Sequence, residues 1–524
     1  MADLTGLQQR SVISAFIFSQ AEVSPRVALF RRSDQVTTYH HHLAPISGHI
    51  EVHETPVTAA WRELREETTL TPDKLFLWRQ GKPFTFSDVS VGRQWTVHPF
   101  AFRLKGPDEG CRGDEAIQTN WEHEEWEWHD PRTVVDSKLS GGVPRLEESL
   151  RRVWFEGVLN DRASKALNTG IAQLVEDHQS GSHELTSIAL KAFQQVLVQI
   201  PGVDTKWWET ARMVAWHLWK NGRESMGAAT LNALLGVLSD MEDIVGRNVD
   251  HEAKWDLLLT TVDSHLMDRK AMPARIKDSV AAYLYTNFLP TAQSRPNSSL
   301  TLLTLSASST IRDSILDAYA SLPFSNLDLR VLESRPLYEG VSMASSILSE
   351  FQSKFASSNQ RLTLTVYTDA SAALASHDVD FVLLGADRIS GSGWVSNKTG
   401  SLPAVLSAKH AAPNVKVLIL SELEKVAEPG AENEHVPEEN DPNEVVSRWL
   451  DAGVKGVGIL AEGLQGVHPP RSNTSVEVKN VYFEWVPADM IDAYICEAGT
   501  LDAAAIQEKA RQVKEKAERY FGEL

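Results

Sequence analysis

The sequence predicts a multidomain α/β protein with three successive regions. Residues 1–150 combine strand-like runs with one clear helix, residues 151–290 have the periodicity of helices, and residues 291–524 alternate strands with helices. A chain of 524 residues exceeds one ordinary hydrophobic core, and its 42% hydrophobic content is that of a globular protein. We therefore expect a mixed α/β domain, then a helical domain, then a parallel-sheet domain.

The first region contains short apolar or alternating runs of the kind that form strands. These runs are SVISAFIF at 11–18, RVALFRR at 26–32 and QWTVHPFAFRL at 94–104. Between the second and the third lies Pro56–Thr68, in which apolar residues recur at helical spacing. The apolar stripe that would dock this helix on a core consists of Val57, Ala60, Trp61 and Leu64.

The second region repeats a helical pattern between Gly, Ser and Asn breaks. Its periodic segments are ELTSIALKAFQQVL at 184–197, MGAATLNALLGVLSDM at 226–241 and IKDSVAAYLYTNFL at 276–289. In the first segment one stripe is formed by Leu185, Ile188, Ala189, Ala192 and Val196. This region is therefore predicted to be a helical domain.

The third region alternates apolar, strand-length runs with helical segments, the signature of a parallel sheet with helical crossovers. The runs are LTLLTL at 300–305, LDLRVL at 327–332, LTLTVY at 362–367, VDFVLLG at 379–385 and VKVLIL at 415–420. Residues 421–444 interrupt the pattern with nine acidic residues and three prolines, so we expect a mobile, solvated acidic loop there.

Charge and cysteine content exclude several classes of protein. The net charge of −19 repels nucleic-acid phosphates and anionic lipid, so nucleic acid and membrane are disfavoured as partners. Cys111 and Cys496 lie far apart and form no CxxC pair, which fits a reducing compartment. With no apolar run approaching roughly 18 residues and no leader-like start, we expect a soluble cytoplasmic protein.

Three glutamates mark the predicted helix as a candidate metal site. Glu63, Glu66 and Glu67 stand at i, i+3 and i+4, so their carboxylates converge on one patch. Like charges at that spacing destabilise a bare helix, and a hard divalent cation would compensate them. Such an ion can bridge a pyrophosphate and activate a water. The alternative is a solvated acidic face held by Arg62 and Arg65.

The wider pattern from Gly48 to Leu70 resembles the Nudix box, the signature of hydrolases acting on nucleoside diphosphates linked to another moiety. Eight of its nine fixed positions are present at the expected spacing. The resemblance covers about residues 8–150 and implies an α/β/α sandwich. It also implies that Glu63, Glu66 and Glu67 bind Mg²⁺ or Mn²⁺ and that one of them serves as base.

The same resemblance gives roles to the flanking residues. It implies that Arg62 orients the glutamates as part of the catalytic set, that Gly48 adds a loop carbonyl to the metal site, and that Glu54 supports the site from outside. The ninth position, normally glycine, is Thr69. A β-branched residue adopts positive φ poorly, so we expect the loop after the helix to differ.

Two further clusters near the first region carry candidate chemistry. NWEHEEWEWHDP at 120–131 fits the last strand of such a fold, where Glu122, Glu124 or Glu125 can reach the metal or act as base; a plain surface strand is the alternative. Adjacent histidines on a strand alternate faces, so the run 40–42 cannot chelate one ion as a set. We favour a structural or substrate-edge role for these histidines.

The third region has a candidate phosphate site after its first strand. Hydroxyls and helix N-terminal amides are offered there by Ser306, Ser308, Ser309 and Thr310. A simply capped helix is the alternative on local grounds.

Specific motifs follow in this region: Glu333 to Pro336 (ESRP), Gly385 to Arg388 (GADR) and Asn397-Lys398. In this order and spacing they resemble a family with two branches. One is the alpha/beta/delta regulatory subunits of translation initiation factor 2B, and the other is the isomerases of methylthioribose 1-phosphate and ribose 1,5-bisphosphate. The resemblance covers about residues 155–510 and implies a helical domain followed by a Rossmann-like one.

The isomerases need a cysteine after the first strand and an aspartate in the GADR segment. Here Asp387 is present, but Ser306 stands at the cysteine position, and a hydroxyl is a far poorer acid or base than a thiol. Phosphate-binding arginines are also depleted, although Arg223 can fill one place. The regulatory subunits are the nearer match, which implies a homodimerising module.

The resemblance further implies that this module binds a sugar phosphate or nucleotide. Its candidate ligand residues are Ser306, Arg335, Asp387, Asn397 and Lys398. Two readings of the whole chain follow. The first is a Mg²⁺-dependent hydrolase of a nucleoside diphosphate derivative, fused to a dimerising or ligand-sensing module. The second is a regulatory, translation-factor-like protein whose Nudix domain only binds; a working isomerase is a third possibility.

Overall fold

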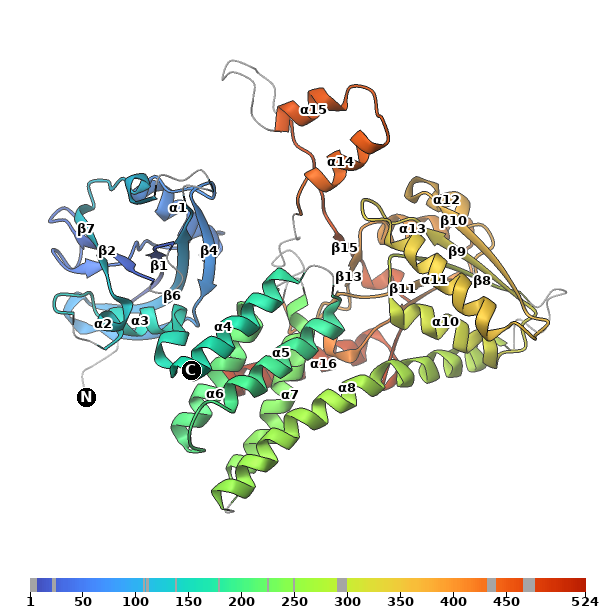
Figure 1. The fold of residues 1–524 in the computed structure, drawn as a ribbon, viewed down its shortest axis with the longest axis horizontal. Helices are drawn as coiled ribbons and strands as arrows, with labels where there is room; N and C mark the ends of the chain where they lie inside the picture. Colours follow the sequence, from blue (N-terminus) through green and yellow to red (C-terminus); the bar gives the residue numbers. More distant parts are fainter. Residues whose placement is uncertain are drawn as a thin grey trace.

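The computed structural model describes residues 7–20, 25–106, 109, 113–136, 139–177, 180–223, 226–247, 250–289, 299–430, 440–464 and 476–524. Figure 1 shows a β-rich N-terminal unit, a central bundle of helices and a C-terminal unit built on a second sheet. Within the described ranges, no helix combines the length and apolar character needed to cross a membrane.

The N-terminal unit is built on a seven-stranded sheet of order β3-β2-β1-β6-β4, with β5 paired to β6 and β7 to β2. Its strands are β1 (Gln8–Phe18), β2 (Val27–Arg32), β3 (Leu43–Ala44), β4 (Leu75–Gln80), β5 (Phe84–Asp88), β6 (Arg93–Leu104) and β7 (His123–His129). Only β1 and β6 run parallel; the other pairs are antiparallel. The strands predicted over 11–18, 26–32 and 94–104 are confirmed.

Helices cover both faces of this sheet, namely α1 (Pro56–Thr68) on one side and α2 (Pro131–Val135) with α3 (Leu146–Val153) on the other. Alternation along β1 explains the arrangement. Ile13 and Ile17 pack with Leu64 of α1, whereas Phe16 packs with Leu150 of α3. The α/β/α sandwich expected from the sequence is therefore present. Short 3-10 turns complete the unit at η1 (Val89–Val91), η3 (Gly113–Ala116) and η4 (Phe155–Val158).

The central bundle contains α4 (Asp161–Glu176), α5 (Ser182–Leu197), α6 (Thr205–Lys220), α7 (Gly227–Val245) and the first half of α8 (His251–Asn287). The predicted stripe on α5 points into its core: Leu185, Ala189, Ala192 and Val196 are buried and Ile188 packs at the margin. The helical region is thus confirmed by its elements.

The C-terminal unit has a seven-stranded sheet of order β10-β9-β8-β11-β14-β16-β17, parallel except for β17. The strands are β8 (Ser299–Leu305), β9 (Asn326–Leu332), β10 (Arg361–Tyr367), β11 (Phe381–Leu384), β14 (Lys416–Leu420), β16 (Ala493–Cys496) and β17 (Gly499–Leu501). All five strands predicted for this region are present and parallel, which confirms the Rossmann-like class.

Helices also cover both faces of the second sheet. One face packs on α8, α10 (Ser309–Ser321) and α11 (Glu339–Lys354), and the other on α12 (Ala372–Ala375), α13 (Ser401–Ala411) and α16 (Ala503–Phe521). A small antiparallel sheet joins β12 (Arg388–Ile389), β13 (Val395–Lys398) and β15 (Phe483–Val486). Helices α14 (Asn443–Asp451) and α15 (Val457–Leu464) form an arm that projects from this side (Figure 1).

Two helices belong to more than one core. On α8, Leu258 lies in the bundle core and Ile276 in the sheet core. On α16, Ile506 packs under the C-terminal sheet and Phe521 packs in the bundle, so the chain end returns to the centre of the molecule (Figure 1). The domain limits at residues 150 and 290 remain predictions. The second limit is not sharp, because the bundle and the C-terminal unit share α8 and α16.

The expectation of a solvated loop over 421–444 is wrong for its first part. Ser421 and Glu422 are each 4% exposed, and η7 (Leu423–Lys425) packs against α7. The last residues of the segment begin α14. Residues 431–439 lie outside the described residues. The remaining 3-10 turns are η6 (Asp369–Ser371) and η9 (Ala488–Met490).

Candidate functional site

Helix α1 carries the candidate site, and its two ends are set by local chemistry. Thr55 caps the helix by accepting a hydrogen bond from the Thr58 N–H at 3.3 Å, and Pro56 fits the first turn because its missing N–H is not needed there. At the other end Thr69 adopts the left-handed conformation, φ 57°, and its N–H donates to the Arg65 carbonyl at 3.0 Å. Thr69 itself thus takes the backbone conformation that a glycine would favour there, and the expected difference in the following loop stays a prediction.

Arg62 is the polar centre of the site. Its Nε and Nη2 donate to the two carboxylate oxygens of Glu54 at 3.0 and 2.9 Å, and its Nη1 donates to Glu63 Oε1 at 2.6 Å. Nη2 also donates to the His49 carbonyl at 2.9 Å, and Glu66 lies 3.5 Å from Nη1. Arg62 thus holds Glu54 and Glu63 in fixed orientations, and its hydrogen bonds lower the pKa of Glu54.

Gly48 is a glycine because the Glu63 carboxyl group lies against it. A Cβ at this position would meet Glu63 Cδ and Oε1 at 1.9 Å, far inside van der Waals contact. The Gly48 carbonyl, expected as a metal ligand, accepts a hydrogen bond from the Ile13 N–H at 2.9 Å. Gly48 therefore gives the Glu63 carboxyl group its place beside the sheet.

Glu67 is buried and paired with a histidine that sequence reasoning missed. His123 Nε2 lies 2.6 Å from Glu67 Oε2, with side-chain exposures of 1% and 2%. Burial lowers the pKa of His123 to about 4. Burial raises the pKa of Glu67 well above its usual range, and the charges of Glu122 and Glu63 add to the effect. Among the described residues, Glu67 Oε1 has no hydrogen-bond partner.

The residues present fit a divalent cation, although the predicted cage is not assembled in this structure. Across the described ranges, no group of three or more His, Cys, Asp or Glu side chains is arranged to hold a metal ion. Glu63 and Glu67 turn instead to Arg62 and His123, and Glu66 is half exposed. Burial and mutual repulsion nevertheless raise the pKa of both Glu63 and Glu67, and Glu67 Oε1 is an orphaned acceptor. These are the hard oxygen donors that Mg²⁺ and Mn²⁺ prefer.

The structure separates the three acids near β7. Glu122 lies close enough to Glu63 and Glu67 to raise the pKa of both. Glu124 instead pairs with His41 at 2.6 Å, and Glu125 pairs with an arginine of β2 at 2.8 Å. Only Glu122 of this set therefore faces the glutamates of α1.

Each histidine of the run 40–42 has a partner within the protein. His40 Nε2 lies 2.6 Å from the Val36 carbonyl, and His42 Nδ1 lies 2.8 Å from the His40 carbonyl. His41 is the member that pairs with Glu124. Each ring is thus occupied by a neighbour of its own loop or of β7.

A cavity of about 270 Å³ opens beside Gly48 and His49. It brings together aromatic side chains and guanidinium groups from β1, β2, β5, β6 and the loops between them: Arg10, Arg32, Arg93, Arg145, Tyr39, Phe84, Phe86 and Trp95. Phe84 and Phe86 stack with ring centroids 6.1 Å apart, and Arg93 lies 5.2 Å from the Trp95 ring. No sequence motif predicted this cavity, because its lining residues come from several segments, the first and last of which lie more than 130 residues apart in the sequence.

Arg32 connects the cavity to the glutamates. It lines the cavity, donates to Ser47 Oγ at 3.3 Å, and its positive charge partly opposes the rise in the pKa of Glu67. Gly48 lines the cavity, and the Glu63 carboxyl group lies against Gly48. A ligand with an aromatic ring and an anionic group can therefore be bound within reach of the acidic helix.

In the C-terminal unit, Ser306 follows β8 with φ 65°, and its N–H donates to Ser334 Oγ at 2.7 Å. Ser308 caps α10 by accepting from the Ile311 N–H at 3.2 Å. The capped-helix alternative thus describes this turn. The backbone amide of Ser334 in turn donates to Asp369, so the turns after β8 and β9 are tied together.

Asp387 lies among cations. Burial raises its pKa, while Lys425, Arg223 and Lys398 act in the opposite direction. Lys398 is 4% exposed and its Nζ donates to Glu339 Oε1 at 2.7 Å. Arg223, expected from the sequence only as a phosphate-binding arginine, thus lies close enough to Asp387 to act on its charge.

The other two candidate ligand residues of the C-terminal unit are Asn397 and Arg335. The Asn397 side-chain amide donates to Ser401 Oγ at 2.9 Å, inside the unit. Arg335 is 56% exposed, and its Nε donates to Glu333 Oε1 at 2.8 Å. Arg335 lines a separate pocket of about 210 Å³ with Arg448 and Lys479, beneath the arm. The structure thus groups Asp387 with Lys398 and leaves Arg335 at an exposed edge.

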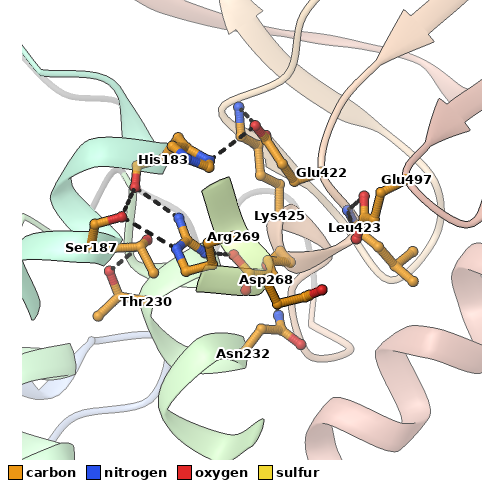
Figure 2. A network of polar contacts seen from close by, with 12 residues as sticks. His183, Ser187, Thr230, Asn232, Asp268, Arg269, Glu422, Leu423, Lys425 and Glu497 are labelled. Carbon is orange, nitrogen blue, oxygen red and sulfur yellow. Dashed lines mark hydrogen bonds and ion pairs between the residues drawn. The ribbon is translucent and has the colours of Figure 1, made fainter. Parts of the chain in front are cut away.

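A network of hydrogen bonds and ion pairs connects the bundle with the C-terminal unit (Figure 2). Arg269 of α8 pairs with Glu424 and donates to the His183 carbonyl at 2.7 Å. Glu422 lies 3.1 Å from Lys425 and 3.5 Å from His183 Nδ1. Lys425 donates to the Ala386 carbonyl at 2.7 Å, so the network reaches the residue next to Asp387.

Comparison with known families matches two segments of the chain. Residues 231–503, just over half of the chain, match the Initiation factor 2 subunit family, and residues 8–153 match the NUDIX domain. The second segment contains all the α1 residues described above.

Among curated proteins, the methylthioribose-1-phosphate isomerase of Magnetococcus marinus is 30% identical over 182 residues, which cover 34% of this chain and 43% of that protein. The enzyme of the same name from Pseudomonas fluorescens is 28% identical over 173 residues, 32% of this chain and 40% of that protein. The chain thus spans about two fifths of the length of these relatives.

Among solved structures, translation initiation factor eIF-2B of Pyrococcus horikoshii OT3 has a TM-score of 0.44 at 19% identity, covering 66% of this chain and 98% of that one. The eIF2B beta of Chaetomium thermophilum has a TM-score of 0.46 at 11% identity, covering 70% and 96%.

Proposed function

Because the chain belongs to the Initiation factor 2 subunit family and carries a NUDIX domain ahead of the matched segment, we propose that its N-terminal unit is a metal-dependent hydrolase of a nucleoside-diphosphate-linked substrate. One observation carries the proposal. Gly48 lines the cavity of aromatic and arginine side chains, and the Glu63 carboxyl group lies against that same glycine.

Each part of the cavity suits a part of such a substrate. Phe84, Phe86 and Trp95 offer ring faces for a base, and Arg10 and Arg93 offer guanidinium groups for phosphate oxygens. Arg32 also lines the cavity, its charge acts on Glu67, and it would receive the phosphate that is to be cleaved. A substrate in this position would have its diphosphate beside the acidic helix.

The chain's own residues prepare that helix for catalysis. Glu63, Glu66 and Glu67 would hold Mg²⁺ or Mn²⁺, with the Gly48 carbonyl as a further donor. When bound, the cation would neutralise the diphosphate and lower the pKa of a water. Arg62 fixes Glu63 by one hydrogen bond and is itself fixed by the two hydrogen bonds that it donates to Glu54.

A base is also available at the site. Glu122 lies close enough to Glu63 and Glu67 to affect both carboxylates electrostatically. His123, next to it, holds Glu67 through Nε2 and stays neutral because burial lowers its pKa to about 4. We propose Glu122 or one of the α1 glutamates as the group that removes the proton from the attacking water.

The test is hydrolysis by the purified full-length chain with Mg²⁺ or Mn²⁺. The panel comprises ADP-ribose, NADH, nucleoside diphosphate sugars, diadenosine polyphosphates and nucleoside triphosphates. Glu66→Gln and Glu67→Gln are expected to lower turnover at least about 100-fold, and Glu125→Gln, on the outer face of β7, serves as the matched control. Absence of turnover by the folded, metal-loaded wild type would favour a binding-only N-terminal unit in a regulatory, translation-factor-like protein.

For the C-terminal unit we propose dimerisation and sensing of a sugar phosphate or nucleotide in place of isomerisation. Ser306 lacks the thiol needed for proton transfer, whereas Asp387, Lys398 and Lys425 still form a charged group that can bind an anion. Light scattering is expected to give twice the 58.1 kDa chain mass. A monomer would refute the dimer, and a cytoplasmic location is part of the same proposal.

A further inference from the structure

A second large cavity, of about 680 Å³, lies where the N-terminal unit meets the bundle. Its walls come from β4 and β6 on one side and from η4 and α4 on the other. The two sides are separated by about 50 residues of sequence or more, yet they line one cavity. This second cavity shares no lining residue with the cavity beside Gly48.

Three arginines gather at this cavity in a chain whose net charge is −19. Arg79 is 7% exposed, Arg103 lies over the Trp78 ring at 4.3 Å, and Arg132 reaches in from α2 with a side chain that is 73% exposed. An isolated buried guanidinium group is costly unless an anion or hydrogen-bond acceptors accompany it. Two carboxylates, Glu156 and Asp161, also line the cavity, and Asp161 lies 4.0 Å from Arg132. Three guanidinium groups still outnumber two carboxylates there, and this excess of positive charge indicates an anionic partner.

A buried carboxylate faces the same space. Glu156 is 6% exposed, and Arg79 and Arg103 both favour its charged form, while burial opposes it and raises its pKa. Among the described residues, Arg79 Nε and Glu156 Oε1 have no hydrogen-bond partner. One donor and one acceptor, both in nine-tenths-buried side chains, are thus left for a molecule inside the cavity.

The backbone is shaped to present these groups. The pairing of β4 with β6 shifts register between Leu77 and Arg79, so Trp78 is an extra residue in the strand. Such a bulge lets Trp78 and Arg79, which a regular strand would send to opposite faces, both line the cavity. On the opposite wall, Asn168 of α4 accepts from Arg79 Nη2 at 3.1 Å and Ser164 adds a hydroxyl.

From this arrangement we infer that the cavity between β4 and α4 is a binding site for a small phosphorylated sugar, with the phosphate on the arginines and the sugar hydroxyls on Glu156 and Asn168. Guanidinium groups bind phosphate oxygens in pairs, and a carboxylate accepts from neighbouring hydroxyls. The volume lies in the range of small-molecule sites. The inference does not depend on the hydrolase proposal, because none of these residues belongs to the α1 site.

Isothermal titration of the full-length chain with ribose 5-phosphate, ribose and inorganic phosphate tests the inference. We expect ribose 5-phosphate to bind at least tenfold more tightly than either fragment. Asn168→Ala and Glu156→Gln should each weaken it tenfold or more, and Arg132→Ala about threefold. Arg162→Ala, an exposed arginine of α4 outside the cavity, should leave it unchanged. Thermal unfolding checks that each variant is folded, and Arg132, on the surface, gives a variant that should fold in any case.

Hydrogen exchange locates the ligand. Protection by ribose 5-phosphate is expected in residues 75–80 and 161–176. Binding that survives all three cavity variants, or that is lost in Lys398→Gln of the C-terminal unit while they retain it, would overturn the inference. So would equal affinity for inorganic phosphate and ribose 5-phosphate, since the hydroxyls would then contribute nothing, and so would no binding at all.

Discussion

The substitution Gly48→Ala is expected to remove most of the proposed hydrolase activity without unfolding the chain. The new methyl group would lie 1.9 Å from Glu63 Cδ, whereas ordinary contact begins at 3.4 Å, so the carboxyl group must move by about 1.5 Å. Misplacing a catalytic group by about 1 Å can lower a rate on the order of 100-fold. We therefore expect a loss of at least about 100-fold in kcat.

The loss should be confined to the site because the clash is with the far end of a flexible side chain. Arg62 would have to follow Glu63 or release it, so Mn²⁺ affinity, measured by electron paramagnetic resonance, is expected to fall as well. Hydrolysis of the best substrate and thermal unfolding are measured together. Gly458→Ala is the matched control, since a Cβ there meets no atom within 4 Å. A Gly48→Ala variant with wild-type kcat and an unchanged Tm would refute the role given to Glu63.

Three further outcomes are expected. Burial lowers the pKa of His217 to about 3, so the unfolded chain binds the extra proton first as pH falls below about 6.5. The free energy of unfolding should then drop by up to about 1.4 kcal/mol per pH unit between pH 6.5 and pH 3. When it is measured by denaturant unfolding at several pH values, it should depend less steeply on pH in His217→Gln than in the wild type. Asn221→Ala removes two hydrogen bonds to the Gln80 backbone, at 2.7 and 3.1 Å, and should cost about 1–3 kcal/mol in the same assay; an unchanged midpoint would contradict this. Because of Ser306, the wild type should leave methylthioribose 1-phosphate and ribose 1,5-bisphosphate unchanged by product NMR, and turnover of either would contradict the assignment.

Periodicity predicted most of the fold because burial patterns are local. The helix Pro56–Thr68 and the five parallel strands of the C-terminal unit follow directly from apolar residues at periods of 3.6 and 2, or from continuous apolar runs. Strand β4 was not predicted. Its bulge breaks the alternation, and its burial pattern, with two exposed residues in succession, has no period of 2.

The sequence predicted the glutamates of the candidate site but not their tertiary partners, for a different reason. Glutamates three and four residues apart can be recognised on one helix, but His123 reaches Glu67 across 56 residues. The cavity beside Gly48 depends on Arg10, Phe84 and Arg145, which no spacing connects. Tertiary contacts of this kind carry no local pattern, so their chemistry appears only when the strands are paired.

The acidic segment shows how composition alone misleads. Glu422 belongs to a run of charges that suggests solvent, yet its pKa is lowered because Lys425 and His183 offset the cost of burial. Removing a partner would leave a buried charge uncompensated, which is more costly than losing an exposed ion pair. The sequence shows the number of charges, but only the fold shows which of them have partners.

Buried polar contacts of the same kind connect the fused units. A flexible tether would leave each unit with its own polar surface in water, but here the Gln80 backbone pairs with Asn221, and Arg152 donates to the Leu524 carbonyl at 3.1 Å. Those groups are partly or fully buried, so parting the units would exchange these hydrogen bonds for hydrogen bonds to water. Helix α16 adds a second connection, because its last turn packs in the bundle while its first packs under the C-terminal sheet. A ligand bound between β4 and α4 would therefore act on a junction that is already held in place, so it would change the strength of the connection between the units more than their arrangement.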